Sequence, residues 1–384
     1  MKKEVLNICF SAGVKYKGVY YLAATYMNAL FSYDENKNKL TYIASFKKEK
    51  KKHKLYYNAF LYKDEAWYIP YQADYIAIVN LKKNKIEYMP LLYRKEYCQS
   101  FLKYTNFLCF KEDYLCLVPR DVDAAMLIDL RNKKAKGYYN IVKGDKDYPY
   151  HSVIFREGKI YFFPWNEEKI LMLDLETDER DYIDWYGGKE VIRDTIYDQK
   201  MGYLVHSSAK DNYILVDDFY GNIYKKIYFG NWDDNEYKIC YVSRDGRNYF
   251  FWGHEKNIVL KVNIDNFETK IYSIEYNSLG IYFFPISSND IEALVFEGNC
   301  IIKYDKENDT FLNIYMSTTS EKFIEEIENS DNRLGDVVGI FKDDFFEENN
   351  KLEIRHLIFY ILHKKSLNCN RNKTNIGRKI YKRL

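Results

Sequence analysis

The chain has 384 residues, of which 47% are hydrophobic and 30% charged, a balance typical of a soluble globular protein and not of a disordered chain. Its 58 Lys and Arg residues against 56 Asp and Glu residues give a formal net charge of +2, which does not indicate a dedicated nucleic-acid-binding protein. Aromatic residues reach 18%, with 40 Tyr among them, and such side chains favour β-strands.

The N-terminal sequence MKKEVLNICFSAGVKYKG lacks the continuous apolar stretch of a secretory signal, and the uncharged segment from Gly18 to Tyr33 is shorter than a membrane span. The seven Cys residues are widely separated and never form a C-x-x-C pair, so neither a disulfide framework nor a zinc ribbon is indicated. We therefore expect a cytoplasmic protein with free thiols and without a bound metal or cofactor.

A repeat runs along the chain, and each copy has one marker residue. A short strand ends on Asp or Asn, a charged turn such as ENKNK follows, and another strand begins. Asp and Asn side chains accept hydrogen bonds from nearby backbone N–H groups in turns, so each copy predicts a β-hairpin. The markers follow one another at intervals of 42 to 49 residues: Asp34, Asn80, Asp129, Asp174, Asp217, Asn263 and Asp305.

Two further strands precede each marker. The nearer one reads VYYLAA (19–24), AWYIP (66–70), YLCLVP (114–119), KIYFFP (159–164), GYLVH (202–206), NYFFW (248–252) and IEALVF (291–296). The earlier one is represented by LYYNAFLY (55–62), HSVIFRE (151–157) and KICYVSRD (238–245). A lone four-stranded unit leaves both of its faces partly uncovered, and radial stacking of such units buries them.

This repeat resembles that of the β-propeller superfamily over roughly residues 5–316. The kelch-like group is similar in its strand-rich repeat, but Gly187-Gly188 is the only Gly-Gly pair in the chain, so the kelch signature is missing. The resemblance implies an all-β, seven-bladed β-propeller with four-stranded blades in residues 1–316. We expect a charged, partly helical extension in residues 317–384, where the repeat has ended.

In a propeller, the loops between second and third strands share a face with the connections between blades, and recognition commonly uses such loops. Tyr, Trp, Arg, Asn and His residues at these positions can stack on a sugar or a base and bond to its edges. Aromatic residues that merely plug the blade ends would give the same pattern. The candidate ligand-binding rim consists of Tyr71, Gln72, Arg120, Asp121, Trp165, Asn166, His206, Trp252 and His254.

The connection between the first two blades carries a basic patch. It could dock phosphate, an acidic protein or an anionic polymer, or it could be a solvated loop tip. The patch consists of Lys47, Lys48, Lys50, Lys51, Lys52 and Lys54.

Catalytic motifs are scarce, because the chain has no HExxH, P-loop, GxGxxG or GxSxG sequence. The sevenfold repetition of the marker residues indicates a shared turn-capping role rather than catalysis or metal binding. His206 and His254, expected in loops of adjacent blades, are the best ionisable candidates, although chance pairing is the simpler interpretation. We assign no catalytic residue.

The composition changes where the repeat stops, near Tyr315. Residues 321–350 carry ten acidic and three basic residues and include SEKFIEEIEN, which predicts a short helix with Ser320 as its N-cap. Residues 351–384 carry ten Lys and Arg against the single acid Glu353, and KLEIRHLIFYILHKKSL places apolar residues mainly on one helical face. We expect this segment to pack on the propeller or a partner, with contact to an anionic membrane as the alternative.

The leading expectation is a non-enzymatic binding or scaffold propeller that recognises a protein partner or a glycan-like ligand through one loop face. One alternative is an enzyme that acts on a carbohydrate or related small molecule at the central channel. The other is a peripheral membrane-associated protein held by its basic C-terminal tail. The binding prediction depends on missing motifs and on what propellers commonly do.

Overall fold

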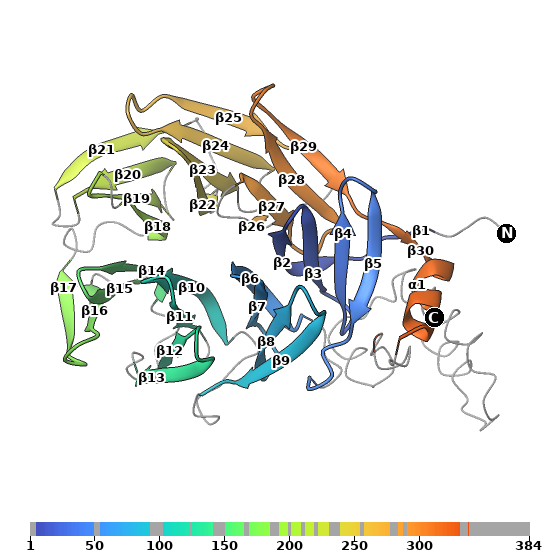
Figure 1. Ribbon diagram of the computed structural model, residues 1–384. Coiled ribbons are helices and arrows are strands. Elements are labelled where there is room, and N and C mark those ends of the chain that lie inside the picture. Colours follow the sequence, from blue (N-terminus) through green and yellow to red (C-terminus); the bar gives the residue numbers. More distant parts are fainter. Residues whose placement is uncertain are drawn as a thin grey trace, which may run out of the picture.

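The computed structural model describes residues 5–49, 54–92, 103–120, 122, 124–140, 150–164, 169–184, 192–198, 201–208, 212–218, 222–229, 239–253, 257–276, 283–286, 290–330 and 337. These residues form seven four-stranded antiparallel sheets arranged in a ring (Figure 1), which is a seven-bladed β-propeller. The predicted fold class and blade count are confirmed.

Each blade is a meander of four consecutive strands. The first strand lies nearest the centre of the ring and the fourth at its rim (Figure 1). Blades 1 and 2 are β2 (Phe10–Tyr16), β3 (Val19–Ala24), β4 (Leu30–Asp34), β5 (Lys39–Ala44), then β6 (Tyr56–Tyr62), β7 (Glu65–Pro70), β8 (Tyr75–Asn80) and β9 (Lys85–Pro90). Blades 3 and 4 are β10 (Tyr104–Phe110), β11 (Tyr114–Pro119), β12 (Ala124–Asp129), β13 (Lys134–Asn140), then β14 (Tyr150–Arg156), β15 (Lys159–Pro164), β16 (Lys169–Asp174) and β17 (Arg180–Asp184).

The last three blades follow the same order. Blade 5 is β18 (Ile192–Asp198), β19 (Tyr203–Ser208), β20 (Tyr213–Asp217) and β21 (Ile223–Tyr228). Blade 6 is β22 (Ile239–Asp245), β23 (Asn248–Gly253), β24 (Ile258–Asn263) and β25 (Thr269–Ser273), and blade 7 is β26 (Phe283–Pro285), β27 (Glu292–Val295), β28 (Cys300–Asp305) and β29 (Thr310–Tyr315).

The antiparallel meander gives the ring two different faces. One carries the hairpin turns that join the first to the second strand and the third to the fourth, and we call it the turn face. The other carries the loops between second and third strands and the connections between blades, and we call it the loop face. Because strands alternate in direction, the first strand of every blade starts at the loop face.

The marker residues end the third strands, as the repeat predicts. Asp34 Oδ1 accepts hydrogen bonds from the N–H groups of Asn36 (3.1 Å) and Lys37 (3.3 Å). The same capping recurs at the markers of blades 2, 3, 4, 6 and 7. Four positions after the marker, the chain enters the left-handed region, with φ between 45° and 60°, at Asn38, Asn84, Lys133, Asp178, Phe267 and Asp309.

The hydrophobic core is divided among the seven interfaces between neighbouring blades. Buried apolar residues form seven clusters, and each cluster combines side chains from two adjacent blades. For example, Trp67 of blade 2 lies in one cluster with Leu117 of blade 3, and Phe163 of blade 4 lies in another with Leu215 of blade 5. Each sheet face is therefore covered by the next blade, which explains why the strands are aromatic and apolar on both faces.

Backbone hydrogen bonds and a buried ion pair join blades 7 and 1 and close the ring. Strand β1 (Val5–Leu6) pairs with β30 (Thr318–Thr319), and the N–H of Phe10 donates to the carbonyl of Gly298 at 2.9 Å. Near the turn face, the fully buried carboxylate of Glu292 accepts hydrogen bonds from Lys15 Nζ at 2.6 Å and from the Tyr20 hydroxyl at 3.0 Å.

Helix α1 (Ser320–Glu328) lies on the rim beside β5 (Figure 1). The Phe323 ring packs against Phe31 and Tyr42 of blade 1, and a Glu326 carboxylate oxygen accepts the N–H of Tyr42 at 2.8 Å. The predicted helix is present, but its N-cap is Thr319 rather than Ser320, because the Thr319 hydroxyl accepts the N–H of Lys322. The predicted basic helix lies outside the described residues.

Candidate ligand-binding site on the loop face

Aromatic rings from three blades meet at the centre of the loop face. Tyr57 lies near the start of β6, Tyr241 near the start of β22, and Phe284 in β26. The ring centroids of Tyr57 and Phe284 are 4.5 Å apart, and those of Tyr241 and Phe284 are 5.0 Å apart. The hydroxyls of Tyr57 and Tyr241 are hydrogen-bonded at 3.0 Å, so blades 2 and 6 touch across the channel.

Two loop residues complete this group, which we call the central aromatic cluster: Tyr57, Tyr71, Tyr241, Phe284 and Phe296. The rings of Tyr71 and Phe296, from the second-to-third loops of blades 2 and 7, each lie 5.5 Å from that of Tyr57. Phe284 is buried, and the other four side chains are partly exposed. The cluster therefore has a buried base in Phe284 and four partly exposed aromatic side chains around it.

A β-bulge at the start of the first strand aims Tyr57 at the channel. Pairing jumps from Tyr56↔Pro70 to Asn58↔Ile69, so Tyr57 is the extra residue. The same register shift occurs at this position in blades 1, 3, 4, 5 and 6. Bulges re-aim a side chain relative to the regular alternation, and here the side chain turns toward the ring centre.

The described charges beside the cluster are paired. Lys54 Nζ forms an ion pair with Glu297 and lies 6.0 Å from the centroid of the Phe296 ring. The Tyr26 hydroxyl donates to the second carboxylate oxygen of Glu297 at 2.8 Å. Because one ammonium and one carboxylate offset each other, this part of the site favours a polar, uncharged ligand over an ion.

The loop that carries Tyr71 is held by two buried charged residues. Lys103 Nζ donates to the carbonyl of Ala73 at 2.7 Å and to an Asp74 carboxylate oxygen at 2.6 Å. The Glu49 carboxylate accepts the N–H groups of Asp74 and Tyr75, both at 3.0 Å. Burial raises the pKa of Glu49, against the opposing effect of these two donors. Such anchoring fixes the loop before a ligand arrives and lowers the entropy cost of binding.

The structure separates the predicted rim residues into three groups. Tyr71 and Gln72 lie partly exposed in the blade 2 loop, and Arg120 is exposed at the end of β11. His206 and Trp252 are fully buried inside β19 and β23, so their place on a rim needs correction. The sequence pattern misled because each strand continues one or two residues beyond the expected loop start. The remaining four, Asp121, Trp165, Asn166 and His254, lie outside the described residues.

His206 belongs to a buried polar network inside blade 5. Its Nε2 is 2.6 Å from Asp217 Oδ2, its Nδ1 is 2.8 Å from Thr195 Oγ1, and both His206 and Asp217 have no exposed surface. Capping by Asp217 of its own turn stays a prediction, because residues 219–221 of that turn lie outside the described residues. In this hairpin Asp218 also accepts the N–H of Asn222. The network satisfies buried polar groups of three neighbouring strands.

The described members of the basic patch are not a uniform cationic surface. Lys54 is paired with Glu297, and Lys48 Nζ lies over the rings of Tyr75 and Tyr88, 5.3 and 5.8 Å from their centroids. Lys47 is exposed. Lys50, Lys51 and Lys52 lie outside the described residues, so the docking role of this patch stays a prediction.

Three further observations concern metal binding, thiol protonation and membrane spanning. In the described part of the chain, no three His, Cys, Asp or Glu residues are grouped to hold a metal ion. Burial raises the pKa of Cys116 and of Cys300 to about 12, which keeps both thiols protonated near neutral pH. No helix in the same residues is long and apolar enough to cross a membrane.

Comparison with known proteins supports the fold alone. No family model and no curated protein matches the chain. A catalytically inactive virginiamycin B lyase from Staphylococcus aureus with quinupristin superposes with a TM-score of 0.56 at 14% identity, over 82% of this chain and 97% of that one. A streptogramin B lyase superposes with a TM-score of 0.54 at 12% identity, over 70% and 85% of the two chains.

A third similar structure is PorZ, a bacterial surface component of the type-IX secretion system of Porphyromonas gingivalis. It superposes with a TM-score of 0.55 at 10% identity over 83% of this chain, which matches only 38% of PorZ. These structures include both enzymes and a secretion component, so the shared fold does not select a function. The similarity to the kelch-like group stays a prediction.

Proposed function

We propose that the protein is a non-enzymatic binding propeller that recognises a glycan-like ligand on its loop face, over the central aromatic cluster. One observation carries this proposal: partly exposed tyrosine rings from different blades converge at the channel mouth, with Tyr71 on a loop fixed by Lys103 and Glu49. A sugar ring has an apolar face that stacks on aromatic rings and hydroxyl groups that bond to tyrosine hydroxyls.

The electrostatics support a neutral ligand over a charged protein segment. Beside the central aromatic cluster, the positive charge of Lys54 and the negative charge of Glu297 offset each other in an ion pair. A charged peptide would gain little there, whereas a carbohydrate needs rings and hydrogen-bonding groups. The proposed activity is therefore recognition of a ligand and not catalysis. The central aromatic cluster supplies a surface that can orient a ligand, and we assign no reacting group to it.

A glycan array tests the proposal. The intact protein, labelled at its N-terminus, would be applied beside the double variant Tyr57→Ala, Tyr71→Ala and beside Tyr228→Ala, whose substituted tyrosine is exposed on β21 far from the channel. We expect defined glycans to bind the wild-type protein and Tyr228→Ala equally. The double variant should bind them at least tenfold more weakly, because two stacking rings are lost.

Two results would contradict the proposal. Absence of glycan binding by the wild-type protein would reject a carbohydrate ligand and favour the protein-partner alternative. Equal binding by the wild-type protein and the double variant would place the glycan site elsewhere. Circular dichroism of both variants checks that a lost signal reflects the site and not unfolding.

A further inference from the structure

Two residues of the loop face have a left-handed backbone, and they form an ion pair with each other. Lys54 lies in the connection between blades 1 and 2 with φ of 50°, and Glu297 lies in the second-to-third loop of blade 7 with φ of 57°. The other described non-glycine residues with positive φ all lie in hairpin turns of the turn face. Such a backbone persists only where the surrounding structure holds it, and it is concentrated at functional sites.

Blade 1 holds both residues in place. The N–H of Lys54 donates to the carbonyl of Thr25 at 2.6 Å, and the N–H of Glu297 donates to the carbonyl of Phe10 at 3.0 Å. The hydroxyl of Tyr26 donates to the Glu297 carboxylate at 2.8 Å. The ion pair therefore crosses the loop-face end of blade 1, and we call Tyr26, Lys54 and Glu297 the loop-face clamp.

The loop-face clamp keeps hydrogen-bonding capacity after its own contacts are made. The side chains of Lys54 and Glu297 are 27% and 28% exposed. Among the described residues, the Glu297 carboxylate accepts from Lys54 and Tyr26 only, although a carboxylate has about four acceptor sites. The Lys54 ammonium has more N–H donors than its contact with Glu297 uses. The clamp thus presents a charged donor and a charged acceptor to solvent, side by side.

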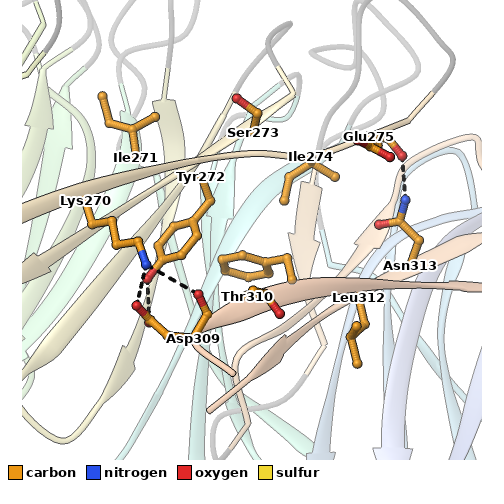
Figure 2. Close-up of a pocket in the computed structure, with 11 residues that line it drawn as sticks. Lys270, Ile271, Tyr272, Ser273, Ile274, Glu275, Asp309, Thr310, Leu312 and Asn313 are labelled. Atoms are coloured by element: carbon orange, nitrogen blue, oxygen red, sulfur yellow. Dashed lines mark hydrogen bonds and ion pairs between the residues drawn. The ribbon is translucent and has the colours of Figure 1, made fainter. Parts of the chain in front are cut away.

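A similar ion pair in the groove between β25 and β29 shows the difference (Figure 2). There Lys270 pairs with Asp309 and lies 4.7 Å from the centroid of the Tyr272 ring. The Asp309 carboxylate accepts hydrogen bonds from four side chains: Lys261, Lys270, Tyr272 and Tyr304. These donors fill its acceptor sites, so Asp309 supports its own hairpin, whereas Glu297 retains sites that a ligand can use.

An aromatic ring stands beside the clamp. The partly exposed Phe296 ring lies 6.0 Å from Lys54 Nζ and 5.5 Å from the ring of Tyr57. A sugar stacked on these rings presents hydroxyl groups at its edge, and each hydroxyl can donate to a carboxylate or accept from an ammonium. Because Lys54 and Glu297 are in direct contact, they suit two hydroxyls that are close together. The closest such pair on a sugar ring stands on adjacent carbons.

We propose that the loop-face clamp selects sugars with two free hydroxyls on adjacent ring carbons, one donating to Glu297 and the other accepting from Lys54. This inference rests on the proposed glycan binding over the central aromatic cluster and names the class of sugar for that site. Hydrogen bonds to charged groups are stronger than neutral ones, so each hydroxyl contributes to selection. A sugar carboxylate at this place is repelled by Glu297, and a sugar ammonium by Lys54.

Saturation-transfer NMR with the full-length protein tests the selection. The probes are the methyl glycosides of mannose, galactose and glucose, together with the monodeoxy derivatives of each. We expect at least one parent glycoside to bind. Removal of either of two adjacent hydroxyls should raise its Kd about tenfold or more, as for other hydrogen bonds to charged groups, and removal of the remaining hydroxyls should leave the Kd nearly unchanged.

The variant Glu297→Gln distinguishes recognition from support of the loop. It should bind the parent glycoside about tenfold more weakly, because the charged acceptor is lost. One of the two sensitive monodeoxy derivatives lacks the hydroxyl that Glu297 binds, and it should bind the variant and the wild-type protein equally. Lys270→Met is the matched control, because it removes the similar ion pair on the rim, and it should change none of these Kd values.

Three results would overturn the inference and leave the proposed function standing, provided that array glycans still bind and the variant Tyr57→Ala, Tyr71→Ala weakens them. The first is that none of the parent glycosides binds. The second is that no two adjacent hydroxyls are both required. The third is that Glu297→Gln weakens parent and monodeoxy glycosides by the same factor, as loss of loop support would. Absence of all glycan binding by the wild-type protein would overturn both proposals together.

Discussion

The two faces of the ring differ in how their contacts are distributed among the blades, and this difference distinguishes structural residues from candidate binding residues. On the turn face, capped hairpins with a left-handed residue four positions after the marker recur from blade to blade. On the loop face, Tyr57 meets Tyr71 and Phe296, which occupy the same position directly after the second strands of blades 2 and 7. The turn face therefore repeats the same contact within each blade, whereas the central aromatic cluster joins residues of different blades at one place.

The largest loss of stability is expected on substitution of Trp252. The sequence predicts this residue on the loop face, but it lies in the core between blades 6 and 7. Its ring has no exposed surface and its Nε1 donates to Ser243 at 2.8 Å. Trp252→Ala should lower the free energy of unfolding by about 3–5 kcal/mol, as for other buried aromatic truncations. Urea denaturation measures this. A loss below about 1 kcal/mol would mean that Trp252 is a surface residue after all.

The second largest loss of stability is expected at one of two marker residues that we compare, Asp217 and Asp34. Asp217→Ala should lower the free energy of unfolding by about 3 kcal/mol, because it leaves His206 buried without its carboxylate partner. Asp34→Ala should have a several-fold smaller effect, because water can replace the carboxylate at an exposed turn. The two variants are compared in the same urea titration, and equal losses would show that the contact with His206 adds no stability beyond that of an ordinary marker residue.

The smallest expected effect is a pH dependence at the hairpin of blade 7. Hydrogen bonds from Lys270, Tyr272 and Tyr304 hold the pKa of Asp309 well below its ordinary value of 3.8. A depressed folded-state pKa contributes stability above the unfolded-state pKa, and this stability is lost as the pH falls. Asp309→Asn should therefore be less stable than the wild-type protein at pH 7.

The stability difference between the two proteins should shrink as the pH falls below about 4, where the wild-type carboxylate of the unfolded chain becomes protonated. Asn is a suitable replacement, because it tolerates the left-handed φ of 49° at this position. Thermal denaturation at several pH values measures the difference. A gap that stays constant between pH 7 and pH 3 would contradict the role of the ionised carboxylate.

The sequence predicted the fold well, because seven evenly spaced markers and their flanking strands describe a local, repeated unit. The helix after blade 7 was also predictable, with its N-cap displaced by one residue to Thr319. Tyr57 was not predicted, because a bulge decides where its side chain points and no residue type signals that bulge. The contact between Tyr57 and Tyr241 joins residues 184 positions apart, so it depends on how the ring closes. The contact of Asp217 with His206 was not predicted, because His206 faces it from another strand.

Binding of a ligand over the central aromatic cluster is tested most directly by hydrogen–deuterium exchange. The exchange would be measured with and without a saturating concentration of a glycan that binds in the array. We predict slower exchange in residues 54–58, 71–75 and 296–299, with no change in the turn-face hairpin of residues 34–39. Protection confined to the turn face or to the rim strand of residues 269–273 would contradict it.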